Sequence, residues 1–213
     1  MKPREIWQAN RGFVLFVFLM FAFRSTFADW NDVPSGSMRP TIIEGDRIFV
    51  NKMAYDIRVP FTHISLFRTG DPERGDVALF DSAVSDKRLV KRVIGVPGDV
   101  VQMQAGRLII NGEPVRYSHE ASGSIEHLDS GDHAVQWREG QAWLTEFGPL
   151  EIPAERYLVL GDNRNNSADS RVIGLVPRDE FVGRSRHVVL SLDYDRYLLP
   201  RGDRFFITLD PHG

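Results

Sequence analysis

Two serines and one lysine have the residue types that nucleophilic catalysis requires. Ser35 and Ser37 flank Gly36 near the start of the chain, and Lys91 follows further along. A serine hydroxyl attacks well only after a neighbouring base has taken its proton, and a lysine can be that base only where its surroundings keep the amine neutral. Because the serines are two positions apart, one can attack while the other, with a backbone N–H, donates to the oxyanion. Taken alone, the same serines also fit a plain polar turn.

The sequence around Lys91 predicts a strand in which this side chain has apolar neighbours. In a strand, Leu89, Lys91 and Val93 share one face, whereas Arg88 and Arg92 lie on the other. An unperturbed lysine has a pKa of about 10.4, and desolvation lowers it by up to several units. Two interpretations follow. Either Lys91 is a desolvated base while Arg88 and Arg92 stay in solvent, or Lys91 is a solvated surface lysine, as most lysines are.

A third polar cluster, residues 161–171, reads Gly-Asp-Asn-Arg-Asn-Asn-Ser-Ala-Asp-Ser-Arg. Side chains of these types form hydrogen bonds to nearby backbone and fix irregular structure. A calcium loop is excluded, because an arginine and an isoleucine occupy positions where ligands would be needed. The cluster instead predicts a turn clamped by an ion pair between Asp169 and Arg171, and Ser167 within it can also serve catalysis.

The composition excludes several classes of protein. At 213 residues and 42% hydrophobic content the chain can bury one good core with a small additional subdomain, and its scattered prolines and glycines predict many short strands. A net charge of −3 gives no footprint for nucleic acid, and the sequence has neither a phosphate-binding glycine motif nor a zinc ligand set. The absence of cysteine excludes disulfides and thiol catalysis. We expect an enzyme that uses no cofactor and no metal.

The N-terminal segment is apolar, with basic residues around it. Residues 12–23 carry no charge, and residues 6–30 reach the roughly 17 to 25 residues that span a bilayer, provided that Arg11 and Arg24 extend to the two interfaces. The alternative is a cleaved secretory signal, with small residues at suitable spacing before Asp29. Under either interpretation the basic start keeps the N-terminus in the cytoplasm and predicts export of the rest.

We favour a retained anchor over residues 1–30, which would place the candidate nucleophile near the membrane. Ser37 is only thirteen positions beyond Arg24, and an extended residue covers about 3.3 Å. A later stretch, Val59–Phe67, either packs in the core or dips into the lipid surface. Its large apolar residues are Phe61, Ile64, Leu66 and Phe67. The predicted active site would therefore act on substrates presented at the bilayer.

Together these segments resemble the type I signal peptidases, the membrane-bound serine/lysine-dyad proteases of family S26 that remove signal peptides from exported proteins. The resemblance covers the chain from about Val33 to Leu190 and rests on four boxes in the family's order: residues 34–41, 74–80, 91–99 and 161–171. It implies a mainly β catalytic domain with a small inserted β subdomain, preceded by one N-terminal transmembrane helix. The domains would be residues 1–30 as tail and anchor, 31–102 with 154–213 as catalytic domain, and 103–153 as insertion.

The resemblance also implies a role for each candidate residue. Ser37 would be the nucleophile, Lys91 the general base, and the Ser35 hydroxyl an oxyanion donor beside the Ser37 N–H. The supporting residues would be Ser167, which orients the lysine amine, and Asp169 with Arg171, which hold the loop. The sequence departs from the common pattern at Asn165, where many members have an aspartate. This departure puts any ion pair through that position in doubt, but not the dyad.

Location and partners follow from the same resemblance. The enzyme would be a single-pass protein of the bacterial cytoplasmic membrane, with its N-terminus in the cytoplasm and its catalytic domain on the extracytoplasmic face. Its partners would be exported preproteins and the lipid bilayer, and not nucleic acid. Substrate residues before the cut would lie extended against a sheet edge, with small side chains, alanine above all, in shallow pockets.

The insertion contains a polar stretch, Ser118 to Gly140, whose low apolar content predicts mobile surface loops. Three histidines, His119, His127 and His133, fall in it. A serine/histidine/aspartate triad or a metal site built on them is disfavoured, because such segments hold side chains poorly.

Two other functions remain open on the sequence. One is a specialised peptidase that processes a dedicated exported substrate, such as a pilin or conjugation subunit, which the compact insertion and single anchor allow. The other is an inactive membrane-anchored binding protein that keeps the fold. The joint presence of Ser37, Lys91 and Ser167 disfavours this second function.

Overall fold

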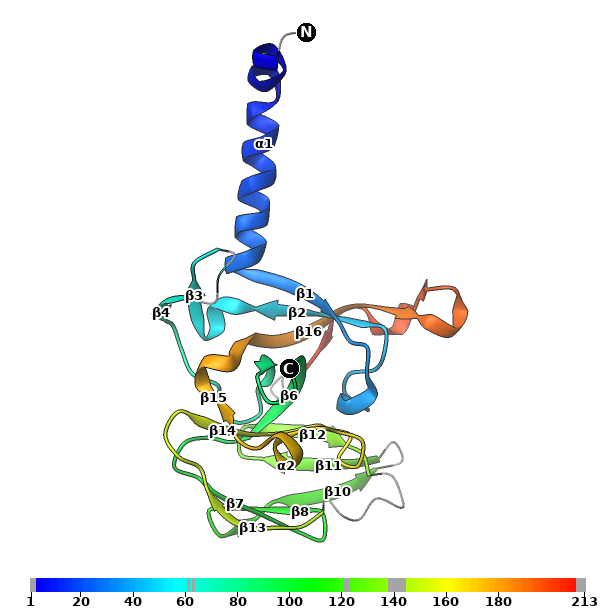
Figure 1. Cartoon of the computed structure of the whole chain (residues 1–213). Helices are drawn as coiled ribbons and strands as arrows, with labels where there is room; N and C mark the ends of the chain where they lie inside the picture. The colour runs from blue at the N-terminus through cyan, green and yellow to red at the C-terminus, as the bar shows by residue number, and fades with distance from the viewer. Residues whose placement is uncertain (1–2, 61, 63, 121–122, 138–144, 210–213) are drawn as a thin grey trace.

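The computed structural model describes residues 3–60, 62, 64–120, 123–137 and 145–209, and it consists of one long helix that projects from a body of β-sheet (Figure 1). The helix, α1 (Pro3–Thr26), carries large apolar side chains that are exposed on successive positions from Phe13 to Phe16 and from Phe18 to Phe21. None of the described helices combines the length and mean hydropathy of a membrane span. The N-terminal helix is therefore present, while its crossing of a bilayer stays a prediction.

The main sheet forms the centre of the body. In the described part of the chain it has nine strands, in the order β1-β2-β16-β5-β6-β14-β15, with β17 and β18 both paired to β16. Its pairings are antiparallel. The strands are β1 (Ala28–Asp32), β2 (Asp46–Asn51), β5 (Val77–Ser82), β6 (Lys87–Gly95), β14 (Arg156–Leu160), β15 (Val176–Pro177), β16 (Phe181–Asp193), β17 (Leu199–Pro200) and β18 (Ile207–Thr208). The predicted mainly β architecture is confirmed.

Both faces of the main sheet are buried at β5. Val77 and Leu79 belong to one apolar cluster, whereas Ala78 and Phe80 belong to another. Alternate residues of a strand point to opposite faces, so β5 has core on each side. The neighbouring strand β6 is exposed at its start and buried from residue 91 to its end. Lys91 thus lies where β6 enters the interior.

The segment between β6 and β14 forms two smaller sheets. One has the order β13-β7-β8-β9 and the other β10-β11-β12. Their strands are β7 (Val100–Gln104), β8 (Arg107–Ile110), β9 (Glu113–Pro114), β10 (Arg116–Glu120), β11 (Gly123–Leu128), β12 (Gly131–Val135) and β13 (Phe147–Glu151). We call β10, β11 and β12 the inserted sheet. In Figure 1 both small sheets lie at the end of the body opposite α1.

The prediction of mobile loops from Ser118 onward is wrong for the described residues, because they form the inserted sheet. Two antiparallel ladders pair these strands. Polar side chains are buried there, among them Glu126 and His133. A low apolar content was misleading, since backbone hydrogen bonds and a buried polar network order this segment instead of an apolar core.

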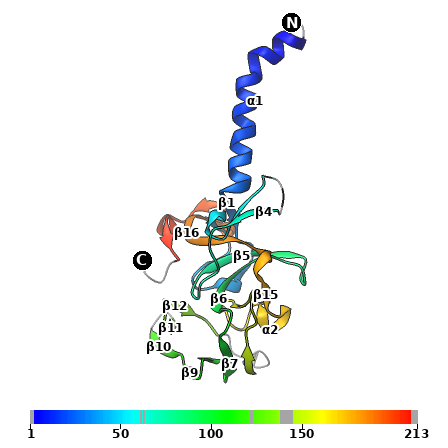
Figure 2. The same cartoon turned by 90° about the vertical axis from the view of Figure 1, so that its left-hand side faces the viewer.

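A hairpin of β3 (Asp56–Arg58) and β4 (Ser65–Arg68) stands beside the end of α1 that meets the body, and both views agree on this position (Figures 1 and 2). Ile64, Leu66 and Phe67 are more than half exposed on it. The interpretation of these three residues as core is therefore wrong. Phe61 lies outside the described residues.

Candidate active site

The candidate nucleophile lies in a short 3-10 turn, Gly36–Met38, that follows the extended Ser35. Two hydrogen bonds from Asn163 hold this turn: its backbone N–H donates to the Ser37 carbonyl at 3.1 Å, and its side-chain Nδ2 donates to the Gly36 carbonyl at 2.9 Å. Asn163 belongs to the polar loop at residues 161–171. The polar loop therefore helps to fix the position of this turn.

Lys91 reaches the nucleophile from the main sheet. Lys91 is 2% exposed, and its Nζ lies 2.6 Å from Ser37 Oγ. Burial lowers the pKa of the Lys91 amine to about 8, against the opposing charges of Asp169 and Asp162. The surface-lysine interpretation is therefore wrong. A substantial fraction of the amine is neutral near pH 8, as a general base must be.

Ser35 stands beside the pair on the exposed side. Its Oγ is 3.5 Å from Ser37 Oγ, at the outer limit of a hydrogen bond, and the residue itself is exposed while Ser37 is half-buried. A donor in this place is open to a peptide approaching from solvent. Its hydroxyl is placed to donate to the oxygen of a carbonyl group whose carbon Ser37 attacks.

Ser167 packs behind the nucleophile. Its Oγ is buried and forms no hydrogen bond within the described residues. A Cβ added at Gly161 would lie 2.3 Å from Ser167 Oγ and 2.5 Å from the Ser37 carbonyl oxygen, so glycine is the residue that fits between them. The structure thus brings Ser167 to the site without a hydrogen bond to Lys91, and its orienting role stays a prediction.

The ion pair predicted between Asp169 and Arg171 is present. Arg171 Nε and Nη2 donate to the two carboxylate oxygens at 2.8 and 2.7 Å. The same carboxylate accepts the Gly161 N–H at 3.0 Å, and Arg171 also donates to the Arg164 carbonyl at 2.5 Å. The ion pair therefore connects the end of the polar loop to its beginning. Asn165, the departure noted in the sequence, is buried within it.

Arg92 was expected in solvent, and this prediction is wrong. Arg92 is 1% exposed, and it pairs with the buried Asp162 at the start of the polar loop. Its third nitrogen donates to the Gly75 carbonyl at 2.9 Å, and Thr41 Oγ1 donates to Asp162 at 2.6 Å. Burial alone would raise the pKa of the Asp162 carboxyl, but the Arg92 charge outweighs it and holds that pKa below its usual range.

The reason for the error is that both faces of β6 are covered at this point. Alternation along a strand separates its faces but does not tell which face meets water. Arg88 fulfils its prediction, because it lies on the exposed start of β6 and pairs with Asp81 at 2.7 Å. Asp162, which comes shortly after the strand β14, was the residue in the sequence that could have indicated a buried partner for Arg92.

None of the three histidines of the insertion forms a hydrogen bond or ion pair with Ser37 in the described part of the chain. His119 contacts Ser124, and His127 contacts Ser118. His133 is buried beside Glu126 in the inserted sheet. Among the described residues, no three histidine, aspartate or glutamate side chains converge as a metal ion would require.

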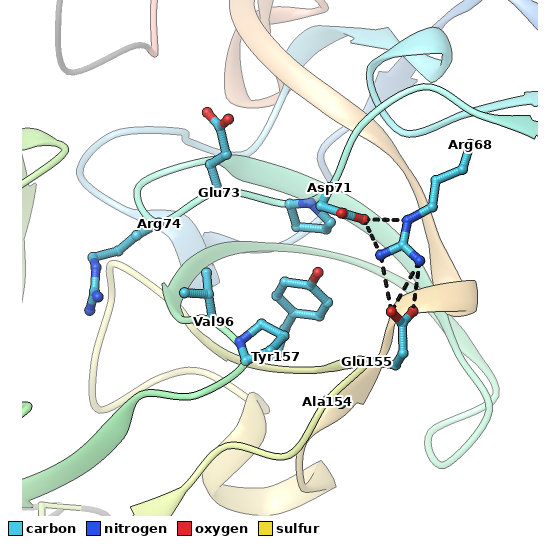
Figure 3. Close-up of a pocket in the computed structure, with 10 residues that line it drawn as sticks. Arg68, Asp71, Glu73, Arg74, Val96, Ala154, Glu155 and Tyr157 are labelled. Atoms are coloured by element: carbon cyan, nitrogen blue, oxygen red, sulfur yellow. Dashed lines mark hydrogen bonds and ion pairs between the residues drawn. The ribbon is translucent and has the colours of Figure 1, made fainter.

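A surface pocket of 450 Å³ lies away from these residues (Figure 3). Arg68 on its wall donates to Asp71 at 2.7 Å and to Glu155 at 3.0 Å, so its charge is compensated within the wall. None of the candidate catalytic side chains lines it. We assign it no part in the chemistry.

The sequence profile of a known family fits most of this chain. The family described as "Signal peptidase, peptidase S26" matches residues 6–190. The chain belongs to this family. Its relatives include "Signal peptidase I" of Pseudomonas fluorescens, 36% identical over 85% of this chain and 72% of the relative, and "Probable signal peptidase I-2" of Synechocystis sp., 32% identical over 86% and 73%.

A solved structure from the same family also matches. The crystal structure of a signal peptidase I from Enterococcus faecalis V583 is 28% identical, covers 53% of this chain and 95% of that one, and superposes with a TM-score of 0.36. A score this low does not define a common arrangement of the whole chains.

Proposed function

We propose that this S26 peptidase cleaves N-terminal signal peptides from exported preproteins with Ser37 as nucleophile and Lys91 as general base. Membership of the family makes the chain a signal-peptide-removing serine peptidase. The observation that supports the dyad is the 2.6 Å contact between the buried Lys91 amine and the Ser37 hydroxyl.

The reaction is an acyl transfer in two halves. Neutral Lys91 takes the Ser37 proton as Oγ attacks the carbonyl at the cleavage site, and the lysine ammonium then gives this proton to the leaving amine of the mature protein. The signal peptide is left as an ester of Ser37. In the second half Lys91 deprotonates a water, which attacks the ester and releases the signal peptide carboxylate. Ser37 recovers its proton from the ammonium, so the enzyme is regenerated.

The oxyanion needs donors that are in place before the attack. We assign this role to the Ser35 hydroxyl and the Ser37 backbone N–H, because Ser35 is exposed beside the nucleophile. Donors of this kind contribute about 3 kcal/mol of transition-state stabilisation each. Ser167 would limit the motion of the lysine amine by packing, while Asp169 and Arg171 hold the loop.

We further propose that α1 anchors the enzyme in the bacterial cytoplasmic membrane, with residues 1–30 as tail and anchor and the N-terminus in the cytoplasm. The exposed apolar side chains of α1 support this, since water is an unfavourable surrounding for so many of them. The remaining residues would form an extracytoplasmic catalytic domain, 31–102 with 154–213, that carries the insertion 103–153. The hairpin of β3 and β4 would meet the lipid surface.

The test uses the full chain in detergent with several preproteins and mass spectrometry of the products. Cleavage at the end of each signal peptide by the wild type, together with loss of cleavage in Ser37→Ala and in Lys91→Ala, supports the proposal. Cleavage of a single preprotein among many would indicate a dedicated processing peptidase. Undiminished cleavage by folded Ser37→Ala would refute the proposed nucleophile.

A further inference from the structure

We propose that Glu126, in the inserted sheet, is a positioning residue for the reaction: its buried ion pair with Arg164 fixes the loop on which the nucleophilic turn rests. The inference depends on Ser37 being the nucleophile, as proposed above. It gives the insertion a part in catalysis, although no hydrogen bond or ion pair joins its described residues to Ser37 or Lys91.

The first step is the pair itself. Glu126 is 0% exposed, and its Oε1 accepts a hydrogen bond from Arg164 Nη2 at 2.6 Å. Its other oxygen accepts from the Tyr117 hydroxyl at 2.6 Å, and His133 Nε2 lies 3.2 Å from Oε1. These partners come from β10 and β12, on either side of β11. The Tyr117 hydroxyl and the Arg164 guanidinium therefore hold the two carboxylate oxygens, with His133 packed beside them.

The second step joins the inserted sheet to the polar loop. Arg164 Nε donates to the Gly161 carbonyl at 3.2 Å, so the guanidinium that binds Glu126 also binds the first residue of the polar loop. Just beyond β12, Gln136 N–H donates to the Asp162 carbonyl at 2.8 Å, and Arg164 N–H donates to the Gln136 carbonyl at 2.9 Å. The loop thus continues the inserted sheet as a short parallel bridge between Gln136 and Asn163.

The third step reaches the nucleophile. Asn163 stands between the two residues that bond to Gln136, and it is the residue that holds the Gly36 and Ser37 carbonyls. A shift of Arg164 would therefore move Asn163 and with it the Ser37 backbone. A misplacement of about 1 Å at a reacting group can reduce a rate about 100-fold.

Electrostatics argues for position more than for stability as the role of this pair. Burial alone would raise the pKa of the Glu126 carboxyl, but the Arg164 charge outweighs it, and that pKa falls well below its usual range. Both groups are then charged at every working pH. A buried pair gains little over apolar side chains of the same volume, yet an arginine fork fixes direction in a way that apolar side chains cannot.

The experiment compares Glu126→Gln with a matched control, Asp56→Asn, in the full chain in detergent. Asp56 forms a similarly buried ion pair with Arg178 at 3.0 Å and touches none of the residues at the dyad. We expect both variants to unfold at a lower temperature. Glu126→Gln should lose at least about 10-fold in kcat with KM within about twofold, as expected when only the reacting geometry is lost, whereas Asp56→Asn should keep its kcat.

A double variant, Glu126→Gln with Arg164→Met, separates position from charge burial. It removes the unpaired cation, so we expect its thermal stability to recover while kcat stays low. If Glu126→Gln does not fold, Tyr117→Phe takes its place, because it removes only one bond to the carboxylate and should lower kcat to a smaller extent.

The inference is overturned if the single variant keeps the kcat of the Asp56→Asn control, or if the double variant regains wild-type kcat. Loss of cleavage in Ser37→Ala under the same assay keeps the proposed function intact in either case. Full activity of Ser37→Ala would overturn both.

Discussion

Arg92 donates two hydrogen bonds to the carboxylate of Asp162, at 2.9 and 2.8 Å, and both side chains are 1% exposed. Arg92 adjoins Lys91 on β6, and Asp162 adjoins the residues that hold the nucleophilic turn. The pair therefore links the strand that carries the base to the loop that supports the serine.

Removal of one partner should destabilise the protein strongly. We expect Asp162→Ala to lower the free energy of unfolding by about 3–5 kcal/mol, because Arg92 is left as an uncompensated buried charge. Denaturant unfolding measures this. The matched control is Asp81→Ala in the half-exposed pair with Arg88, which should lose no more than about 1 kcal/mol. Equal losses at the two sites would contradict the buried pair.

The rate of cleavage should follow the protonation of Lys91. The base is active when neutral, and its pKa is about 8, so kcat/KM should rise with pH below 8 and level off above it. The rise should be about tenfold per pH unit on the acid side, as for loss of one proton. Steady-state kinetics between pH 6 and 9 tests this, with thermal unfolding at each pH as control. A rate that is flat over this range would exclude Lys91 as the base.

Lys91 should also make the protein less stable at neutral pH. Its folded pKa is lowered from 10.5 to about 8, so between these values the unfolded chain binds the extra proton. Wild-type stability should then rise from pH 8 to 10.5, by about 3 kcal/mol in total.

The variant Lys91→Met removes this buried charge at similar volume. We expect it to be more stable than wild type at pH 7, with the advantage shrinking as pH rises from 8 to 10.5. Denaturant unfolding at the two extremes gives the comparison. An equal difference between the two proteins at both pH values would mean that the lysine is not desolvated.

Gly161→Ala should impair catalysis more than folding. The new Cβ would lie 2.5 Å from the Ser37 carbonyl oxygen, so the turn must move away. We expect kcat to fall by about 10- to 100-fold, from loss of alignment between Ser37 and Lys91. The control is Gly148→Ala in β13, where a Cβ meets no atom within 4 Å. Unchanged kcat in Gly161→Ala would show that the turn tolerates displacement.

The hairpin of β3 and β4 should contribute to lipid binding. We expect a protein that begins at residue 27, with Ile64→Asp and Phe67→Asp together, to bind lipid vesicles several-fold more weakly than the same protein without them, because each exposed apolar group loses its favourable burial. Vesicle co-sedimentation measures this. Val84→Asp, an equally exposed apolar site, serves as control. Equal binding of all three proteins would remove the hairpin from the proposed membrane surface.

Short-range patterns in the sequence predicted much of the site. Lys91 between Leu89 and Val93 indicated a desolvated amine, and the Asp169–Arg171 pair followed from its spacing in a turn-forming loop. Arg92 was misjudged because alternation separates two faces without telling whether the second is covered. Glu126 gave no local signal, since its partner Arg164 lies 38 positions away and the pairing depends on how the inserted sheet packs.

The fold was predictable in class but not in strand order. Many short strands separated by glycine and proline indicate antiparallel sheet, yet they leave the partners of each strand open. The position of β16 between β2 and β5 depends on pairings between residues more than a hundred positions apart. Such contacts follow from competition among whole-chain arrangements and not from any single segment.

This strand order has a consequence for when the active site can form during folding. Within the sheet, the half that leads to Ser37 meets the half that contains Lys91 only through β16, which follows both in the chain. A chain that has been synthesised only as far as β15 contains Ser37 and Lys91 but lacks the strand that joins the two halves of the sheet. β16 therefore closes the sheet between the two halves, and we expect a chain that ends before it to lack a stable alignment of Ser37 and Lys91 although it contains both residues.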